Sequence, residues 1–257
     1  MPMRVICSIL IAVFLIGSVT SFILLKKSYL AYNLLKLDPL EGKPSENINY
    51  EPSDNKKGIW LIGDSRIARW NTELFSSFGL LVSNFGIEGQ TTSQILLRLK
   101  CDLETNTPEL VFLEAGINDL KIIGLNKKLA VSIKDGCYNN ITAITDLCQK
   151  KNVTIIVINI FPTGRIEFLR RFVWNSSVDL AIVETNERLR LYCKSENIPY
   201  FDAYHFLAGN GYRVEKKYQD DFLHINEKAY ADLSKVLIDE LKRNYSIDLT
   251  RTNIKMQ

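Results

Sequence analysis

One serine, one histidine and one aspartate of this sequence are of the types that nucleophilic acyl transfer requires. Asp221 stands three residues before His224, one of only 2 histidines in 257 residues, and Ser65 ends a Gly-Asp-Ser turn far upstream. A histidine base that an aspartate holds in one tautomer gives a weakly nucleophilic serine hydroxyl its proton acceptor. Each block also has an ordinary structural explanation, as a turn or as the capped first turn of a helix.

Two further segments offer hydrogen-bond donors for an oxyanion. The run NFGIEGQTT contains Gly86 and Gly89, and a Gly-Ile-Asn-Asp turn contains Asn118. Gly89 precedes a predicted helix, where its backbone N–H can approach a substrate oxygen, and Asn118 carries a side-chain amide donor. The backbone N–H of Ser65 also points toward developing negative charge at a helix start. Glycine and asparagine are equally common in loops, so each residue alone is ambiguous.

Alternating apolar runs and helical patterns position these residues. Short apolar segments, typical of strands covered on both faces, occupy residues 59–62, 80–85, 110–115, 154–160 and 198–201. Helical patterns occupy residues 66–78, 92–103, 126–150, 178–196 and 226–244. Strands separated by helices favour right-handed crossovers, so the sequence predicts a three-layer α/β/α sandwich with a five-stranded parallel sheet. Loops at the carboxyl ends of such strands build the site, and Ser65, Gly89 and Asn118 all fall there.

Together the four blocks resemble the SGNH (GDSL-like) hydrolases, a family that includes lipases, thioesterases, lysophospholipases and carbohydrate acetyl esterases. The resemblance covers residues 58–244 and implies a flavodoxin-like sheet, with Ser65 as nucleophile, His224 as base and Asp221 as its partner. It also implies an oxyanion hole formed by the backbone N–H groups of Ser65 and Gly89 and the amide of Asn118. The chemistry of this family requires no metal or organic cofactor.

The sequence departs from the family pattern at two positions. Arg66 stands where leucine often follows the nucleophile, and Ile225 replaces the usual proline after the histidine. Neither change removes a catalytic group. Arg66 indicates either a preference for an anionic substrate or a position on the helix surface, and Gly86 is an alternative to Gly89 as the donor.

The first 57 residues are expected to attach the domain to a membrane. Residues 5–25 carry no charge, and as a helix they reach about 30 Å, the thickness of a bilayer core. We therefore predict an anchor over residues 1–27, a polar linker over 28–57 and the SGNH hydrolase-like domain over 58–257. A cleaved signal peptide is the alternative, although its apolar region is usually only ~7 to 15 residues long.

The charges around the apolar run give conflicting indications of orientation. Arg4 precedes the run, whereas Lys26, Lys27 and Lys36 follow it, which by count alone would keep the domain inside. A very short basic leader before a first apolar segment nevertheless usually stays inside while the rest of the chain crosses. We therefore expect an extracytoplasmic catalytic domain.

Charge and cysteine patterns exclude other classes of protein. The net charge of +3 includes no clustered basic stripe, so nucleic acid is not an expected partner. No Cys-x-x-Cys pair supports a zinc or thioredoxin-like site. The cysteines outside the apolar run are expected to form disulfides or to be buried free thiols: Cys101, Cys137, Cys148 and Cys193.

Two features outside the blocks have open interpretations. His205, the second histidine, is expected to be structural or on the surface rather than a ligand. The aromatic and basic residues at 165–174 either line or cover an acyl pocket, or pack beneath a loop.

The leading hypothesis is a membrane-anchored serine esterase that hydrolyses an ester or thioester of a lipid or cell-envelope carbohydrate. An O-acyltransferase, in which a sugar hydroxyl replaces water, would use the same residues. A non-catalytic anchored binding module is the alternative from a different class.

Overall fold

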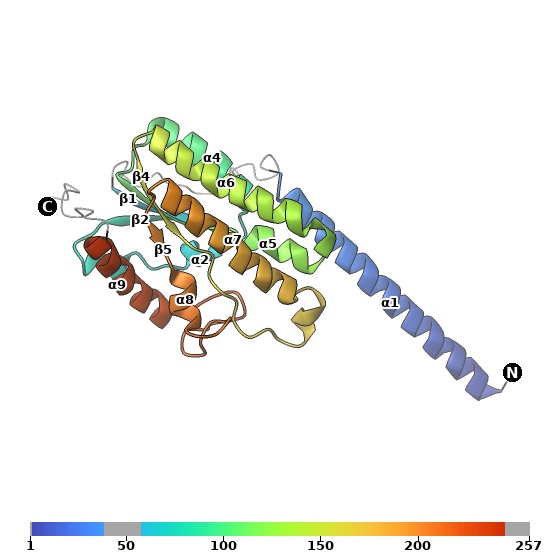
Figure 1. Ribbon diagram of the computed structural model, residues 1–257. Coiled ribbons are helices and arrows are strands. Elements are labelled where there is room, and N and C mark those ends of the chain that lie inside the picture. The colour runs from blue at the N-terminus through green and yellow to red at the C-terminus, as the bar shows by residue number, and fades with distance from the viewer. Residues whose placement is uncertain (1, 39–57, 245–257) are drawn as a thin grey trace.

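A five-stranded parallel sheet forms the centre of the computed structural model, which describes residues 2–38 and 58–244 (Figure 1). The strand order is β2-β1-β3-β4-β5. The strands are β1 (Ile59–Gly63), β2 (Val82–Gly86), β3 (Leu110–Glu114), β4 (Thr154–Ile158) and β5 (Tyr200–Phe201). All five predicted strands are present. Strand β5 is shorter than expected because the N–H of Ile198 still bonds to the Cys193 carbonyl and caps the preceding helix.

Successive side chains of each strand point to opposite faces of the sheet, and both faces are buried. In β1, Ile59 and Leu61 belong to one hydrophobic cluster, while Trp60 and Ile62 belong to the other. This alternation with burial on both sides explains why the strands are continuously apolar in sequence.

Helices cover both faces and complete the three predicted layers (Figure 1). One face packs against α4 (Thr92–Thr105), α5 (Ile117–Leu120), α6 (Ala130–Lys150) and α7 (Ser176–Ser195). The other face packs against α2 (Ser65–Ala68), α3 (Glu73–Ser76), α8 (Ala203–Ala208) and α9 (Glu227–Asn244). The expected α/β/α sandwich is confirmed.

The single helix predicted over residues 66–78 is wrong, because the chain forms two short helices there. The Asn84 side-chain amide donates to the carbonyls of Ile67 (2.7 Å) and Trp70 (2.8 Å), which ends α2. The Asn71 side chain then accepts a hydrogen bond from the N–H of Glu73 (2.9 Å) and starts α3.

Helix α1 (Met3–Leu35) is longer than the expected anchor and continues through the first part of the expected linker. Its last turns pack against the sheet domain through Leu30, Leu34 and Leu37. The hydroxyls of Thr91 (2.6 Å) and Ser93 (2.8 Å), at the start of α4, donate to the carbonyls of residues 36 and 37. The rest of the expected linker, residues 39–57, and the last residues of the expected domain, 245–257, lie outside the described part of the chain.

Among the described helices, α1 has the length and hydropathy of a membrane span, and its apolar stretch is wholly exposed. Figure 1 shows it projecting from one end of the domain. Both a membrane anchor and a signal sequence fit this length and composition.

The contact between α1 and the domain generates a stability prediction. Replacing Leu34 with alanine should lower the free energy of unfolding by about 1 to 2 kcal/mol, less than the ~2–5 kcal/mol of a fully buried leucine. Leu35 is exposed and provides the matched control, for which Leu35→Ala should change little. Chemical unfolding of the full chain in detergent measures both, and equal effects would mean that the helix end does not pack as described.

Candidate active site

The structure brings Ser65, His224 and Asp221 into one hydrogen-bonded row. The Ser65 Oγ lies 3.0 Å from His224 Nε2, and His224 Nδ1 lies 2.8 Å from Asp221 Oδ2. Ser65 follows β1 directly, whereas the other two residues precede α9, so the sheet topology joins blocks 159 residues apart. With Nδ1–H donated to the carboxylate, the Nε2 lone pair faces the serine hydroxyl. This is the arrangement that a nucleophile and its base require, and the catalytic roles stay predictions.

The Asp221 carboxylate folds its own turn as well as orienting the histidine. Its Oδ1 accepts hydrogen bonds from the backbone N–H groups of Leu223 (2.6 Å) and His224 (2.8 Å). Burial alone would raise the pKa of Asp221, but the hydrogen bonds from the His224 ring and these two N–H groups outweigh it and lower the pKa. The carboxylate is therefore held ionised beside the ring.

The predicted oxyanion donors follow the carboxyl ends of β1, β2 and β3, at one edge of the sheet. Within the described residues, the N–H groups of Ser65 and Gly89 have no hydrogen-bond partner. The Gly86 N–H donates to the Asn84 side chain (2.8 Å), which leaves Gly89 as the better candidate. Gly89 has φ +75°, a conformation that favours glycine.

The Asn118 amide is oriented from both ends. Its Nδ2 donates to the Gln90 carbonyl (3.0 Å), next to Gly89, while its Oδ1 accepts from Lys121 Nζ (2.7 Å). The neighbouring Asp119 accepts from the backbone N–H (3.0 Å) and hydroxyl (2.6 Å) of Thr92. These bonds tie the loop after β3 to the segment that follows β2.

A comparison with known families agrees with this geometry. The model of the GDSL-like lipase/acylhydrolase family matches residues 57–231, more than half of the chain. The chain belongs to this family. The resemblance inferred from the four blocks is thereby confirmed, and membership identifies the chain as an ester-hydrolysing enzyme. A comparison with curated protein sequences finds no match.

Solved structures with the same fold include several GDSL-family proteins. A GDSL-like lipase from Bacteroides thetaiotaomicron is 23% identical, with a TM-score of 0.58 over 72% of this chain and 87% of that one. A lipolytic G-D-S-L family member from Veillonella parvula is 18% identical, with a TM-score of 0.54 over 73% and 99%. A carbohydrate acetylesterase family member from Sinorhizobium meliloti is 15% identical, with a TM-score of 0.57 over 72% and 97%. At these identities the likeness shows the shared fold.

Arg66 is completely buried in this acylhydrolase, which corrects both sequence-based interpretations of that residue. Its guanidinium donates to the carbonyls of Phe161 (3.0 Å) and Leu223 (3.1 Å) and lies 3.5 Å from the Glu114 carboxylate. It therefore neither meets a substrate at the surface nor decorates an exposed helix. It instead connects the loop after β4, the end of β3 and the turn that carries His224.

Burial dominates the titration of the carboxyls around Arg66. Burial raises the pKa of Glu114 to about 8, the Asp64 charge adds to the rise, and Arg66 opposes it. Burial also raises the pKa of Asp64, against the charge of Arg66 and the hydrogen bond from its backbone N–H. The buried guanidinium thus lies beside the Glu114 carboxyl, while the Asp64 carboxyl accepts from the Arg66 backbone N–H, and burial favours the protonated form of both carboxyls.

Two lysines near the predicted oxyanion donors were not identified from the sequence. Lys36, at the end of α1, places its Nζ 3.4 Å from the Gly89 carbonyl, and Lys121 bonds to Asn118. Burial lowers the pKa of Lys121, and the charge of Lys36 lowers it further. The spacing of three residues between Asn118 and Lys121 could have indicated their contact. Lys36 carried no such signal, because its stretch was expected to be a linker.

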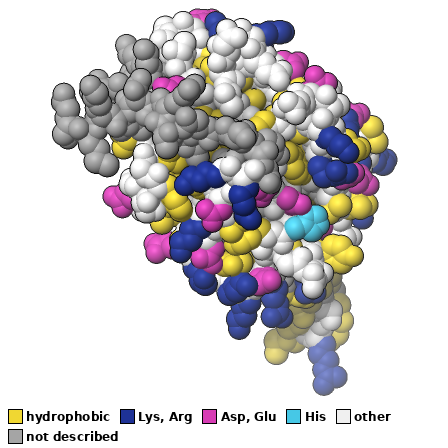
Figure 2. Space-filling view, turned by 60° about the vertical axis from the view of Figure 1, so that its left-hand side comes forward, with side chains coloured by type: hydrophobic (Ala, Val, Ile, Leu, Met, Phe, Trp, Pro, Cys, Tyr) yellow, Lys and Arg dark blue, Asp and Glu magenta, His cyan; other side chains and the backbone are white. Residues whose placement is uncertain are grey.

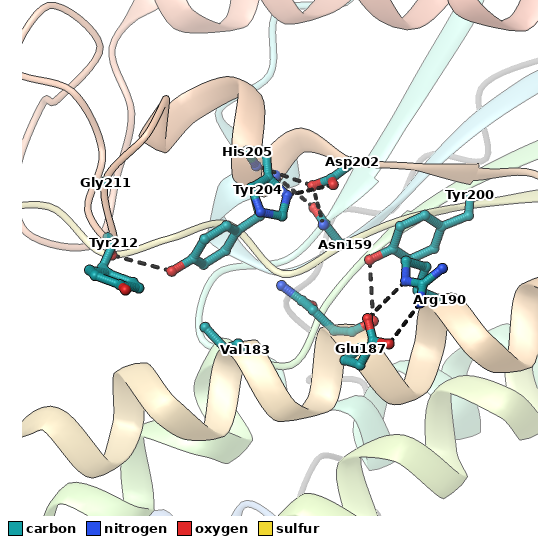
Figure 3. A pocket seen from close by; sticks show the side chains of 11 residues that line it. Asn159, Val183, Glu187, Arg190, Tyr200, Asp202, Tyr204, His205, Gly211 and Tyr212 are labelled. Atoms are coloured by element: carbon teal, nitrogen blue, oxygen red, sulfur yellow. Dashed lines mark hydrogen bonds and ion pairs between the residues drawn. The ribbon is translucent and has the colours of Figure 1, made fainter.

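The spacing Asp-x-x-His occurs a second time, at Asp202 and His205, with the same local geometry. Asp202 Oδ2 lies 2.6 Å from His205 Nδ1, and Asp202 Oδ1 accepts from the His205 N–H (3.1 Å). This pair lines a pocket of about 160 Å³ between α7, β5 and α8 (Figure 3). No serine or cysteine is among the described residues that line it. The His205 side chain is 75% exposed, so the expectation of a surface histidine is confirmed.

The cysteines of the described domain are free thiols, so the disulfide alternative is wrong for this structure. Cys137, Cys148 and Cys193 are buried, as the other alternative expected, whereas Cys101 is exposed. Burial raises the pKa of both Cys148 and Cys193 to about 12, which makes these thiols unreactive.

The buried carboxyl beside Arg66 predicts a pH-dependent stability. Glu114 keeps its proton up to about pH 8 in the folded protein but loses it near 4.5 when unfolded. The folded state then binds the extra proton, so its stability should fall as pH rises through this window, by at most about 1.4 kcal/mol per pH unit. Glu114→Gln should remove this part of the slope, while Glu104→Gln, on the exposed surface of α4, should not. Urea unfolding at several pH values measures it, and an unchanged slope in Glu114→Gln would contradict the assignment.

Proposed function

We propose that this GDSL-family acylhydrolase is a membrane-anchored serine esterase with Ser65, His224 and Asp221 as its catalytic triad. The observation that carries the proposal is the continuous row from the Ser65 hydroxyl through the His224 ring to the Asp221 carboxylate. The second Asp-x-x-His pair lacks a serine in its pocket, so the row at Ser65 is specific to this site.

In the proposed reaction, Ser65 Oγ attacks the carbonyl carbon of an ester while His224 Nε2 takes the hydroxyl proton. The resulting imidazolium is stabilised by Asp221, which stays ionised. His224 then gives the proton to the leaving alcohol or thiol, and the acyl group remains on Ser65. A water molecule then attacks this acyl-enzyme while His224 takes one of its protons. The bond between the acyl group and Ser65 Oγ breaks, the acid leaves, and His224 returns the proton to Oγ, which restores the serine.

The negative charge of each tetrahedral intermediate would be accepted by the N–H groups of Ser65 and Gly89 and the amide of Asn118. Support comes from the two unpartnered N–H groups among the described residues and from the bonds that orient the Asn118 amide. Lys121 polarises that amide by bonding to its oxygen, which strengthens the donor. Loss of one such donor typically costs ~10²- to 10³-fold in turnover.

The proposed substrate is an ester or thioester of a lipid or of a cell-envelope carbohydrate. The family name includes lipases, and one structural neighbour is described as a carbohydrate acetylesterase family member. Hydrolysis is preferred to acyl transfer because the matched family is one of acylhydrolases.

We interpret α1 as an uncleaved anchor and not as a signal peptide. Its helix continues 10 residues past the apolar run to Leu35, and its end packs on the domain core. Lys36 then reaches the Gly89 loop. Cleavage directly after the apolar run would cut this continuous helix, and the end that stays packed on the domain would have no membrane attachment.

The proposed triad predicts that ester hydrolysis depends on His224 and not on His205. Ser65→Ala and His224→Ala should each lower turnover of nitrophenyl esters by ~10⁴- to 10⁶-fold, as expected for residues that act as one unit. His205→Ala is the matched control and should keep full activity, because its Asp-x-x-His turn has the same form without a nucleophile. The purified full chain in detergent is assayed with acyl chains from acetyl to long, after circular dichroism shows that each variant is folded. Activity that survives Ser65→Ala would exclude the proposed mechanism.

The anchor also predicts an orientation, with the catalytic domain on the extracytoplasmic side. The support is the single basic residue, Arg4, in a very short leader before the apolar run. A reporter enzyme that is active only outside the cytoplasm, fused after Gln257, should be active, and a cytoplasmic reporter at the same position should be silent. The opposite pattern would reverse the orientation and leave the esterase proposal untouched.

A further inference from the structure

Residues 165–174, here called the arginine-aromatic segment, present apolar rings and positive charge to solvent. Phe168 and Phe172 are 72% and 52% exposed, and their rings contact each other edge to face. Arg165 and Arg171 are exposed between and beside them. Neither sequence-based interpretation of this segment accounts for two exposed phenylalanines, because only Trp174 is buried. Large exposed aromatics beside arginines mark an interaction surface.

The segment touches α1 near the end of the apolar run. The Phe172 ring meets the Phe22 ring edge to face, with centroids 5.6 Å apart. Phe22 lies three residues, about 5 Å of helix, before the run ends at Leu25. If α1 spans a bilayer, the exposed rings therefore lie at the boundary of the hydrocarbon layer, and the arginines lie at the level of the headgroups.

The arginines also line a hollow of about 400 Å³ beside the segment. Arg165, Arg171 and Arg213 contribute to its wall together with Trp174 and Ser176. Arg213 is fixed by Asp179 (2.7 Å) and by the Thr163 hydroxyl (2.7 Å). No ion pair or hydrogen bond of the Arg165 or Arg171 guanidinium occurs within the described residues. Figure 2 shows lysine and arginine side chains, interspersed with acidic ones, on the lower part of the domain above the apolar helix.

The same segment packs on the turn that holds the proposed catalytic residues. The Arg170 guanidinium lies 4.1 Å from the centroid of the Phe222 ring, and the Trp174 ring meets that ring edge to face at 5.3 Å. Phe222 stands directly after Asp221 in the chain. A surface that engages lipid headgroups through this segment would therefore hold the site at a fixed height above the membrane.

We propose that the arginine-aromatic segment is a second membrane contact, in which Phe168 and Phe172 enter the bilayer boundary and Arg165 and Arg171 bind anionic phospholipid headgroups. This inference rests on the anchor in the proposed function. It commits to the bilayer as partner because the segment is continuous with the apolar helix and carries the complementary charge.

The test uses the full chain in nanodiscs with an environment-sensitive fluorophore on one cysteine. Cys7 and Cys101, the exposed thiols, are first replaced with serine. The label is then placed at Glu167 in the segment, at Leu191 on the far end of α7, or at Phe14 in the apolar run. Lipids spin-labelled near the headgroup should quench the label at 167, lipids spin-labelled near the ends of the acyl chains should quench the label at 14, and both should leave the label at 191 bright.

Anionic lipid and the two arginines should affect quenching only at position 167, in the arginine-aromatic segment. Quenching at 167 should be stronger in discs that contain phosphatidylglycerol than in phosphatidylcholine alone. Arg165→Gln and Arg171→Gln should each lower the ratio of docked to undocked protein roughly five-fold. Arg190→Gln, an exposed arginine at the other end of α7, is the matched control and should have no effect. Hydrolysis of a soluble nitrophenyl ester should be unchanged in all three variants.

The labels separate failure of this inference from failure of the anchor. Quenching at 14 without quenching at 167 would overturn the second contact and leave the anchor intact. A bright label at 14 would show that α1 does not enter the bilayer, which overturns the anchor and the contact together. Quenching at 167 that is the same in Arg165→Gln and Arg171→Gln as in the unsubstituted chain would contradict the binding of headgroups by these arginines.

Discussion

The buried guanidinium of Arg66 is the interaction on which the arrangement of the site depends. It belongs to the residue after the proposed nucleophile, yet it bonds to the Leu223 carbonyl, directly before His224, and to the Phe161 carbonyl in the loop after β4. It also lies 3.5 Å from the Glu114 carboxyl group at the end of β3. A buried charge is costly unless it is paired and hydrogen-bonded, so these partners must stay in place for the domain to remain folded. The distance between Ser65 and His224 is therefore fixed by a contact that no substrate touches.

The end of helix α1 is part of the hydrolase domain and not a tether attached to it. Its leucines pack on the core cluster, and the carbonyls of the two residues that follow it, 36 and 37, accept hydrogen bonds from Thr91 and Ser93 beside the Gly89 loop. Lys36 follows the end of the apolar run by 11 residues, about 16 Å of helix. If α1 spans a membrane as proposed, this continuous helix sets the height of the proposed site above it. A long polar linker, as the sequence suggested, would have left that height variable.

The two Asp-x-x-His turns show why a local pattern does not define a catalytic group. In each turn the aspartate accepts a hydrogen bond from the N–H of the histidine three residues later and faces its Nδ1. This geometry needs only the short-range preference of aspartate for capping a helical turn. His224 differs from His205 in what lies opposite its Nε2. That neighbour, Ser65, comes from the carboxyl end of β1 and is supplied by the order of the strands.

The sequence by itself determined the layer architecture, the five strands, the family and the residues that meet at the proposed site. Apolar periodicity and turn-forming residues act over short distances, and the four blocks lie where parallel strands end. Only the tertiary structure decided the break between α2 and α3, the burial of Arg66 and the position of Lys36 near Gly89. Each of these depends on a partner far away in the chain: Asn84 for the helix break, the loops after β3 and β4 for Arg66, and the packing of α1 for Lys36. Interactions between distant residues leave no periodic mark on either segment, so no local pattern could have revealed them.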